Sequence, residues 1–190
     1  MSLELIIGPM FAGKSSTILQ RVKRAEVIGV KTLIVTSILD TRYNTSTNLV
    51  KTHDSQTRDA VGLRDIRDIT MLGVFQTAKL IIIEEAQFFK HLRETVEILV
   101  EIYRLDVIVV GLDGDSDRKP FGEILLLVPI ADTITKITAL CKRCCDGTAA
   151  LFTFCSLNKE KDSQIKVGGE ETYEALCRRH YIENTSLSRL

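Results

Sequence analysis

A phosphate-binding loop is predicted at residues 8–15, because this stretch matches the pattern G-x-x-x-x-G-K-[ST] at every fixed position. Glycines at the two fixed positions let the backbone close around phosphates. Lys14 would neutralise the transferred phosphate, and the hydroxyl of Ser15 would contribute to a magnesium site. The candidates for binding nucleotide phosphates are therefore Gly8, Pro9, Met10, Phe11, Ala12, Gly13, Lys14 and Ser15.

Two adjacent carboxylates, Glu84 and Glu85, follow the apolar stretch 79–83, which reads as a buried strand. At the end of a strand in a phosphate-loop protein, such residues suit two roles. One holds magnesium directly or through water, and the other positions or deprotonates the nucleophile. The alternative is a polar surface turn that ends a strand. We favour the chemical roles because the phosphate loop requires an acidic partner.

A zinc site is predicted from two pairs of ligands, Cys141 with Cys144 and Cys177 with His180. Each pair has two intervening residues, which is the spacing of closed tetrahedral structural zinc sites. Cys145 is an alternative to Cys144. The fifth cysteine, Cys155, is left over, and we expect it to be buried in a strand.

The polar stretch 38–60 lacks clear periodicity and is predicted to be a functional or mobile loop. Arg42 within it could reach a phosphate, or it could be a solvated side chain. His53 alone is more typical of a hydrogen-bonding loop histidine than of a catalyst.

The stretch 113–117 resembles the start of a calcium loop, with aspartate at alternate positions. The glycine that such a loop requires is replaced by Arg118, and its final glutamate is replaced by Ile124. We therefore reject calcium binding. A mixed acidic and basic loop that follows a parallel strand lies instead at the sheet edge where ligands bind.

The elements that must position these residues follow a strand–helix–strand order, which predicts a right-handed parallel crossover. Period and composition predict strands at 3–7, 31–37, 79–83, 107–112, 132–140 and 151–157, and helices at 14–28 and 88–104. The stretch 125–131 is apolar, and the polar tail from residue 183 is predicted to be frayed.

Composition excludes several classes of protein. The 190 residues suffice for one sizeable core with a small additional lobe. The 25 basic residues balance 25 acidic ones, which argues against a grip on a long polyanion. Apolar runs are far too short to span a membrane and no signal peptide is recognisable, so we expect an intracellular protein with reduced or metal-bound cysteines.

In combination these motifs resemble the type II thymidine kinases, a zinc-containing family. The matching stretches are GPMFAGKS, DTRY, THDS, EEAQFF, LDGDSDRKPFG, GGEETY and the paired zinc ligands. They occur in order and cover nearly the whole chain. The resemblance implies an α/β fold: a RecA-like parallel P-loop sheet flanked by helices, with a small C-terminal zinc-ribbon lobe that carries a lasso loop. The expected division is a kinase domain at 1–140, the lobe at 141–182 and the frayed tail at 183–190.

The resemblance further implies transfer of the γ-phosphate of ATP to the 5′-hydroxyl of thymidine, and of deoxyuridine, in nucleotide salvage. Glu85 matches the family's general base, and Glu84 matches an aspartate on the Mg²⁺ side. Arg42 matches an arginine near the transferred phosphoryl group. Asp40 and Gln87 belong to the same nucleotide-binding motifs.

For the nucleoside, the resemblance implies a lasso loop that reads the base largely through its main chain. In this sequence the loop maps to Gln164, Ile165, Lys166, Val167 and Gly168. The other matching substrate positions are Met10, Phe88, Leu112, Ser116, Arg118 and Tyr173. The spacing after Cys144 differs from the family pattern and leaves open which residue faces the thymine methyl group; Thr153 is our candidate.

Three positions depart from the family pattern. Glu84 stands where aspartate is usual, so its extra methylene would shift the metal or require an intervening water. Ser116 stands where an aromatic residue is usual, which removes one wall of the base pocket. His180 stands where many relatives have cysteine, and it remains a normal zinc ligand.

From the resemblance we also expect a cytoplasmic homotetramer inhibited by thymidine triphosphate, with ATP, Mg²⁺ and Zn²⁺ as cofactors and neither nucleic acid nor membrane as a partner. Two alternatives remain. A nucleic-acid-stimulated P-loop ATPase with a zinc ribbon is opposed by the neutral charge and the lack of tryptophan. A non-catalytic nucleotide-binding protein is favoured only by the departures at Ser116 and Glu84.

Overall fold

The computed structural model describes residues 1–39, 49–51, 57–156 and 171–187. Several predicted site residues lie outside these ranges, namely Asp40, Arg42 and the lasso positions Gln164, Ile165, Lys166, Val167 and Gly168. His53 also lies outside them.

A six-stranded parallel sheet forms the centre of the larger part of the chain, in the order β5-β2-β6-β7-β1-β8. Its strands are β1 (Ser2–Ile7), β2 (Thr32–Ser37), β5 (Val61–Leu63), β6 (Leu80–Glu84), β7 (Asp106–Gly111) and β8 (Thr133–Lys136). Each pairs in parallel with its neighbours, so all of their carboxyl ends lie at one edge. The predicted α/β class with a parallel sheet is confirmed.

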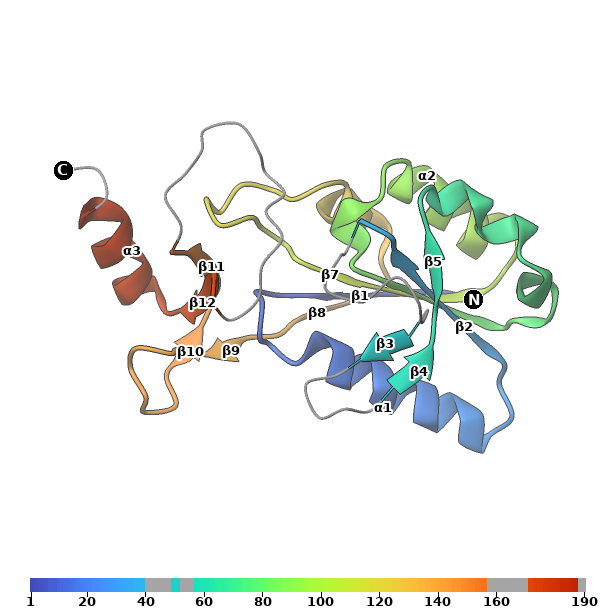
Figure 1. The fold of residues 1–190 in the computed structure, drawn as a ribbon. Helices are drawn as coiled ribbons and strands as arrows, with labels where there is room; N and C mark the ends of the chain where they lie inside the picture. Colours follow the sequence, from blue (N-terminus) through green and yellow to red (C-terminus); the bar gives the residue numbers. More distant parts are fainter. Residues whose placement is uncertain (40–48, 52–56, 157–170, 188–190) are drawn as a thin grey trace.

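One face of the sheet is covered by α1 (Lys14–Val27), which lies below the sheet in Figure 1. Its buried positions include Ile18, Val22 and Ala25, which pack with Ile6 and Ile82 of the sheet. This apolar spacing is what the sequence pattern of a helix predicts. The helix begins directly after the phosphate loop, so the sheet and α1 together fix that loop from both sides.

The other face is covered by short helical segments. They are the 3₁₀ segments η1 (Ile66–Met71), η2 (Gly73–Thr77), η3 (Ala86–Phe88) and η5 (Ile124–Ile130), with α2 (Leu92–Glu97) and the π-helical turn Ile98–Ile102. The apolar stretch 125–131 thus lies almost entirely in η5. The buried side chains on this face form the larger core cluster, which includes Ile81, Phe89, Leu92, Leu99 and Ile124.

The single helix predicted over 88–104 is wrong in its extent. Phe88 ends a 3₁₀ turn, Phe89 is extended, and His91 has a left-handed backbone with φ of 58° before α2 begins. The chain must reverse after β6, so the first residues of the stretch form a turn. The apolar stripe still packs as predicted at Phe89 and Leu92, whereas Tyr103 is half exposed.

Two further segments differ from the sequence-based expectation. The strand predicted over 132–140 is divided into β8 and β9 (Ala139–Leu140), which belong to different sheets. The neighbouring strand β1 ends at Ile7, so the chain beyond β8 finds no further partner in the main sheet. The stretch 38–60, predicted without regular structure, contains the antiparallel pair β3 (Leu49–Lys51) and β4 (Thr57–Asp59).

A small lobe lies beyond the carboxyl edge of the sheet, on the left in Figure 1. It contains β9 paired with β10 (Ala149–Ala150), β11 (Phe152–Cys155) paired with β12 (Tyr173–Leu176), and α3 (Arg178–Leu187). The predicted fraying from residue 183 is wrong as far as residue 187, which still belongs to α3. A side chain supports the helix just past residue 183, since Asn184 Nδ2 donates to the carbonyl of His180 at 2.6 Å.

Candidate active site and metal centre

The phosphate loop joins the end of β1 to the start of α1. Gly13 has a left-handed backbone with φ of 79° directly before the helix, a conformation that glycine adopts without cost. A Cβ atom at Gly8 would lie 2.3 Å from the carbonyl oxygen of Ile137. Both fixed glycines are therefore required by the backbone, one for its dihedral angles and the other for close approach.

Lys14 lies over this loop rather than extending into solvent. Its Nζ donates to the carbonyl of Pro9 at 2.7 Å and to that of Gly8 at 3.3 Å. The ammonium group is thus held beside the backbone that would surround a phosphate. A phosphate oxygen, which carries a full charge, would be a stronger acceptor for it than a neutral carbonyl.

Ser15 and Glu84 are brought together from the two ends of the motif. The Oγ of Ser15 donates to Oε1 of Glu84 at 2.6 Å. Glu84 is the last residue of β6 and only 2% exposed. A hydroxyl and a carboxylate are oxygen ligands of the kind that Mg²⁺ prefers, so this pair has the chemistry of a magnesium site.

Glu85 follows directly with a left-handed backbone, φ 51°. Its side chain is buried, and Oε2 accepts a hydrogen bond from Nε2 of Gln87 at 2.6 Å. The other end of the Gln87 amide, Oε1, accepts from the backbone N–H of Leu112 at 3.0 Å. Gln87 was predicted on the nucleotide side, and the structure places its side chain between Glu85 and the end of β7.

An apolar cluster lies beside these polar groups. Its buried members are Met10, Leu112, Phe121 and Tyr173, with Phe88 among the partly buried ones. Phe88 and Phe121 pack edge to face, with ring centroids 5.5 Å apart. The structure therefore brings together four of the apolar residues that were predicted to contact substrate, and the other two, Ile165 and Val167, lie outside the described residues.

Two members of the cluster were missed or misjudged from sequence. Phe121 had a signal, since it lies in the quoted stretch RKPFG, but no role was assigned to it. Cys155 lies in a strand as predicted, but it is only partly buried and packs against the same cluster. It is the last residue of the short strand β11, in which it pairs with Tyr173 of β12.

Thr153 connects the lobe to the phosphate loop. It is buried in β11, and its Oγ1 accepts a hydrogen bond from the backbone N–H of Met10 at 3.0 Å. The candidate for facing the thymine methyl group therefore lies next to Met10 of the apolar cluster. The geometry also means that the position of the lobe affects the position of the loop.

A second connection runs through Ser116 and Arg118, both predicted to contact substrate. The carbonyl of Ser116 accepts from the hydroxyl of Tyr181 at 2.6 Å. The guanidinium of Arg118 lies over the rings of Tyr181 and Phe152, 4.6 and 5.5 Å from their centroids. In this structure the Arg118 side chain therefore packs on the lobe.

The four predicted zinc ligands converge at the base of the lobe. The Sγ atoms of Cys141 and Cys144 each lie 3.4 Å from Nδ1 of His180, and Cys177 Sγ lies 3.5 Å from it. All four ligand atoms lie within 4.8 Å of one another. With Zn–S bonds of about 2.3 Å, a tetrahedral site spaces its sulfurs by about 3.8 Å, and Cys144 and Cys177 are 3.8 Å apart.

The donor set fits zinc and settles the choice between neighbouring cysteines. Cys145 is exposed, and its thiol bonds the carbonyl of Lys142, so Cys144 is the fourth member of the group. Burial raises the pKa of the Cys141 thiol, but hydrogen bonds with the N–H of Cys177 and with the His180 side chain outweigh this effect, and the pKa falls to about 6. That thiol is thus readily available as the thiolate that zinc binds.

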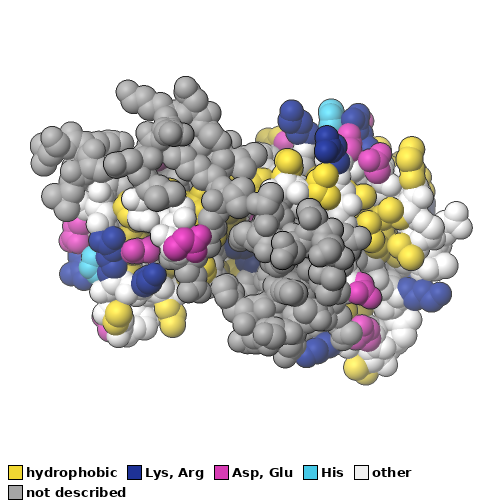
Figure 2. All heavy atoms as spheres, in the orientation of Figure 1, with side chains coloured by type: hydrophobic (Ala, Val, Ile, Leu, Met, Phe, Trp, Pro, Cys, Tyr) yellow, Lys and Arg dark blue, Asp and Glu magenta, His cyan; other side chains and the backbone are white. Residues whose placement is uncertain are grey.

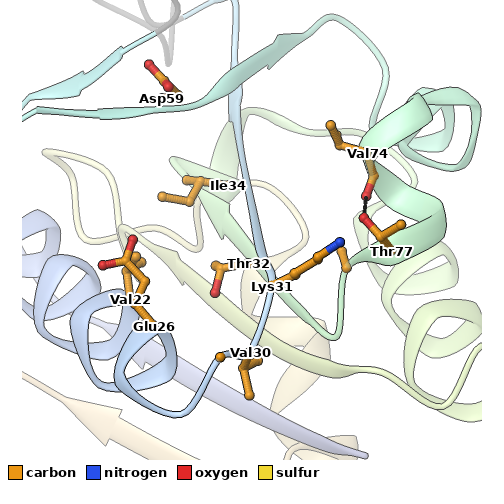
Figure 3. A pocket seen from close by; sticks show the side chains of 11 residues that line it. Val22, Glu26, Val30, Lys31, Thr32, Ile34, Asp59, Val74 and Thr77 are labelled. Carbon is orange, nitrogen blue, oxygen red and sulfur yellow. Dashed lines mark hydrogen bonds between the residues drawn. The ribbon is translucent and has the colours of Figure 1, made fainter.

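A separate hollow of about 540 Å³ lies away from these residues (Figure 3). Its lining includes Val22 and Glu26 of α1, Lys31 and Thr32 at the start of β2, and Val74. These positions lie mostly toward the amino ends of the strands, whereas ligands of parallel sheets bind at the carboxyl ends. We therefore assign no catalytic role to it.

On the face in Figure 2, basic and acidic side chains of the described residues are interspersed. Within the described ranges, no helix combines the length and hydrophobicity needed to cross a bilayer.

Comparison with known proteins finds that this chain is similar to thymidine kinases. The family model described as Thymidine kinase matches residues 1–181. The cytosolic thymidine kinase of Homo sapiens is 38% identical over 97% of this chain and 74% of its own length. Thymidine kinase a of Arabidopsis thaliana is 38% identical over 96% of this chain and 76% of its own. The thymidine kinase of variola virus is 34% identical over 96% and 97%, respectively.

Proposed function

The chain belongs to the thymidine kinase family, and from this premise we propose how its residues phosphorylate thymidine at the 5′-hydroxyl. The family and its named members support thymidine phosphorylation in nucleotide salvage as the activity. The observation that carries the proposed mechanism is the 2.6 Å contact of Ser15 with Glu84. It brings the phosphate loop to the carboxylate pair at the carboxyl edge of the sheet.

In the proposed mechanism Glu85 is the general base that accepts the proton of the 5′-hydroxyl. Lys14 leaves the loop carbonyls and neutralises the transferred phosphoryl group, together with Arg42. Mg²⁺, when bound with ATP, supplies further charge neutralisation there, and Ser15 and Glu84 are the residues that would hold it. Asp40 and the loop residues 8–13 complete the nucleotide site.

The apolar cluster of Met10, Leu112, Phe121 and Tyr173 is proposed to receive the nucleoside, with Phe88 at its side. This proposal is supported by the position of the cluster next to Glu85, since Leu112 and the Glu85 carboxylate are both hydrogen-bonded to the side chain of Gln87. Thr153 is proposed beside the thymine methyl group. The lasso residues 164–168 would cover the base, and Ser116 and Arg118 would approach the nucleoside from the loop 113–118.

The proposal is tested by incubating the purified protein with ATP, magnesium and each deoxynucleoside in turn. We expect monophosphate from thymidine, and also from deoxyuridine, as measured by separating the labelled products. Tight thymidine binding without product would instead indicate a non-catalytic nucleotide-binding protein. ATP hydrolysis that needs DNA and not thymidine would contradict the kinase.

Ser15→Ala is expected to lower turnover by roughly 10–100-fold and to raise the magnesium concentration needed for half-maximal rate. A hydrogen bond to a charged group contributes about 1.5–3 kcal/mol, and here the same hydroxyl is proposed as a metal ligand. The rate is measured in a magnesium titration at saturating ATP. The neighbouring exposed residue gives the matched control, since Ser16→Ala leaves both values unchanged. An unaltered titration for Ser15→Ala would remove this residue from the metal site.

Several wider properties are proposed on the resemblance and the names of relatives. We expect the division into a kinase domain at 1–140 and a lobe from 141, a homotetramer, and inhibition by thymidine triphosphate. We expect no nucleic-acid or membrane partner. The human relative is named cytosolic, which supports a cytoplasmic location for this chain as well.

A further inference from the structure

We propose that Gln87 is a positioning residue, which orients the carboxylate of Glu85, and that Gly111 and Gly122 hold Gln87 in the orientation this requires. The inference rests on the proposed role of Glu85 as general base. It assigns to Gln87 a function in the phosphoryl transfer step that is separate from binding of the nucleotide.

The orientation of the Gln87 amide follows from its partners. The backbone N–H of Leu112 can only donate, so the atom that faces it at 3.0 Å must be the amide oxygen. The amide nitrogen then faces Oε2 of Glu85 at 2.6 Å. Gln87 is 3% exposed, so water cannot readily replace either partner. The end of β7 thus determines which group is presented to the carboxylate.

Glu85 lies outside regular secondary structure, so the position of its carboxylate depends on the groups around it. It lies in a left-handed conformation with φ of 51°, after the last residue of β6. The chain then turns at once, and the N–H of Phe88 bonds the carbonyl of Glu85 at 3.1 Å. This turn carries Gln87 back beside Glu85, so a short local segment supplies the donor.

Two glycines from different segments surround Gln87. A Cβ atom at Gly111 would lie 2.4 Å from the amide oxygen of Gln87 and 2.9 Å from a methyl carbon of Ile124. A Cβ atom at Gly122 would lie 2.2 Å from the carbonyl oxygen of Gln87, and the φ of Gly122 is 60°. Any other residue at either position would displace Gln87. The glycines thus form a cradle for this one side chain and its backbone.

Substitution can separate the two hydrogen bonds. Gln87→Glu keeps an acceptor for Leu112 and replaces the donor to Glu85 by a repelling carboxylate. Gln87→Met keeps the length of the side chain and removes both bonds. Gly111→Ala displaces the amide of Gln87 while the residue types at positions 85 and 87 stay the same. We expect each variant to lower kcat by about 10–100-fold, because misplacing a catalytic group by about 1 Å can cost roughly 100-fold. The KM for thymidine should stay within about threefold.

A double-mutant cycle distinguishes positioning from a general structural role. If Gln87 acts through Glu85, Gln87→Met should cost little more in a protein that already carries Glu85→Gln. The two effects of a purely structural residue would multiply instead. The measurement is product accumulation in long incubations, with thymidine binding and thermal melting as checks on folding. Thr95→Val is the control, because Thr95 is also buried and hydrogen-bonded, to the carbonyl of His91 at 2.8 Å. Its effect should multiply with that of Glu85→Gln.

The outcomes separate this inference from the proposed function. If Glu85→Gln kept near-normal turnover, the role of Glu85 would be wrong and the inference would fail with it. If Glu85→Gln were inactive while Gln87→Met and Gly111→Ala both kept kcat within threefold, the inference alone would be overturned. Multiplying effects in the cycle would also overturn it. Should Gln87→Glu fail to fold, Gly111→Ala and Gln87→Met decide the question.

Discussion

Replacement of Glu85 by glutamine is expected to lower kcat by about 10²–10⁴-fold, which is the usual contribution of a positioned general base. Glutamine has nearly the same size and can still accept the hydrogen bond from Gln87. It cannot take the proton of the 5′-hydroxyl. Folding and thymidine binding should therefore persist while transfer fails. The measurement is the single-turnover rate of monophosphate formation, with thymidine affinity determined separately.

A surface glutamate provides the matched control for this variant. Glu97→Gln removes only an ion pair with Arg93, in which the two atoms are 3.1 Å apart on α2. Exposed pairs of this kind contribute about 0–1 kcal/mol, so turnover should not change. If Glu85→Gln transferred phosphate at a rate close to that of Glu97→Gln, another group would have to be the base.

Loss of zinc is the second change with a large expected effect. Cys177→Ser should abolish stoichiometric zinc and unfold the lobe, while the main sheet stays folded. The buried cluster of the lobe is small, and besides three alanines it contains Leu176, Tyr181 and two of the metal ligands themselves. A lobe of this kind cannot bury enough apolar surface to offset the entropy of its chain, so metal binding must supply the difference.

The loss of the lobe should reach the active site through contacts that the structure shows. Thr153 accepts the hydrogen bond of Met10 in the phosphate loop, and Tyr181 donates to the carbonyl of Ser116. Tyr173, a member of the apolar cluster, belongs to the lobe as well. We therefore expect Cys177→Ser to lower kcat/KM for thymidine by at least about 100-fold, since a buried hydrogen-bonded network and one wall of the site are lost together.

The test combines three measurements: metal content of the purified protein, protease resistance of the lobe, and thymidine kinase activity. Cys145→Ser is the control, because Cys145 is exposed and lies outside the group of four ligands. It should keep zinc and activity. Full activity of Cys177→Ser without bound zinc would contradict the proposed dependence of the active site on the lobe.

Much of the chemistry was determined by local sequence. The phosphate loop could be predicted because its function requires fixed residue types at fixed spacing along a continuous stretch. The same holds for the two zinc pairs and for Glu84 and Glu85 at the end of a strongly apolar strand. The parallel sheet followed from the alternation of buried strands with α1, since a short crossover leaves one handedness. In these cases the signal lies within a few residues of the group it predicts.

Only the tertiary structure decided what lies across from these groups. The stretch RKPFG includes Phe121 but does not indicate that this residue completes the apolar cluster. No local pattern indicated that Gln87 bridges Glu85 to Leu112, or that Tyr181 reaches Ser116. These contacts join residues from different strands and from the lobe. The spacing favoured Cys144 over Cys145 as a zinc ligand, and the structure adds that Cys145 is exposed and lies outside the group of four ligands. The extent of the helix after β6 and the division of the strand at 132–140 depended likewise on where neighbouring strands end. Pairing partners and side-chain directions are set by the whole fold, and a local pattern carries no information about them.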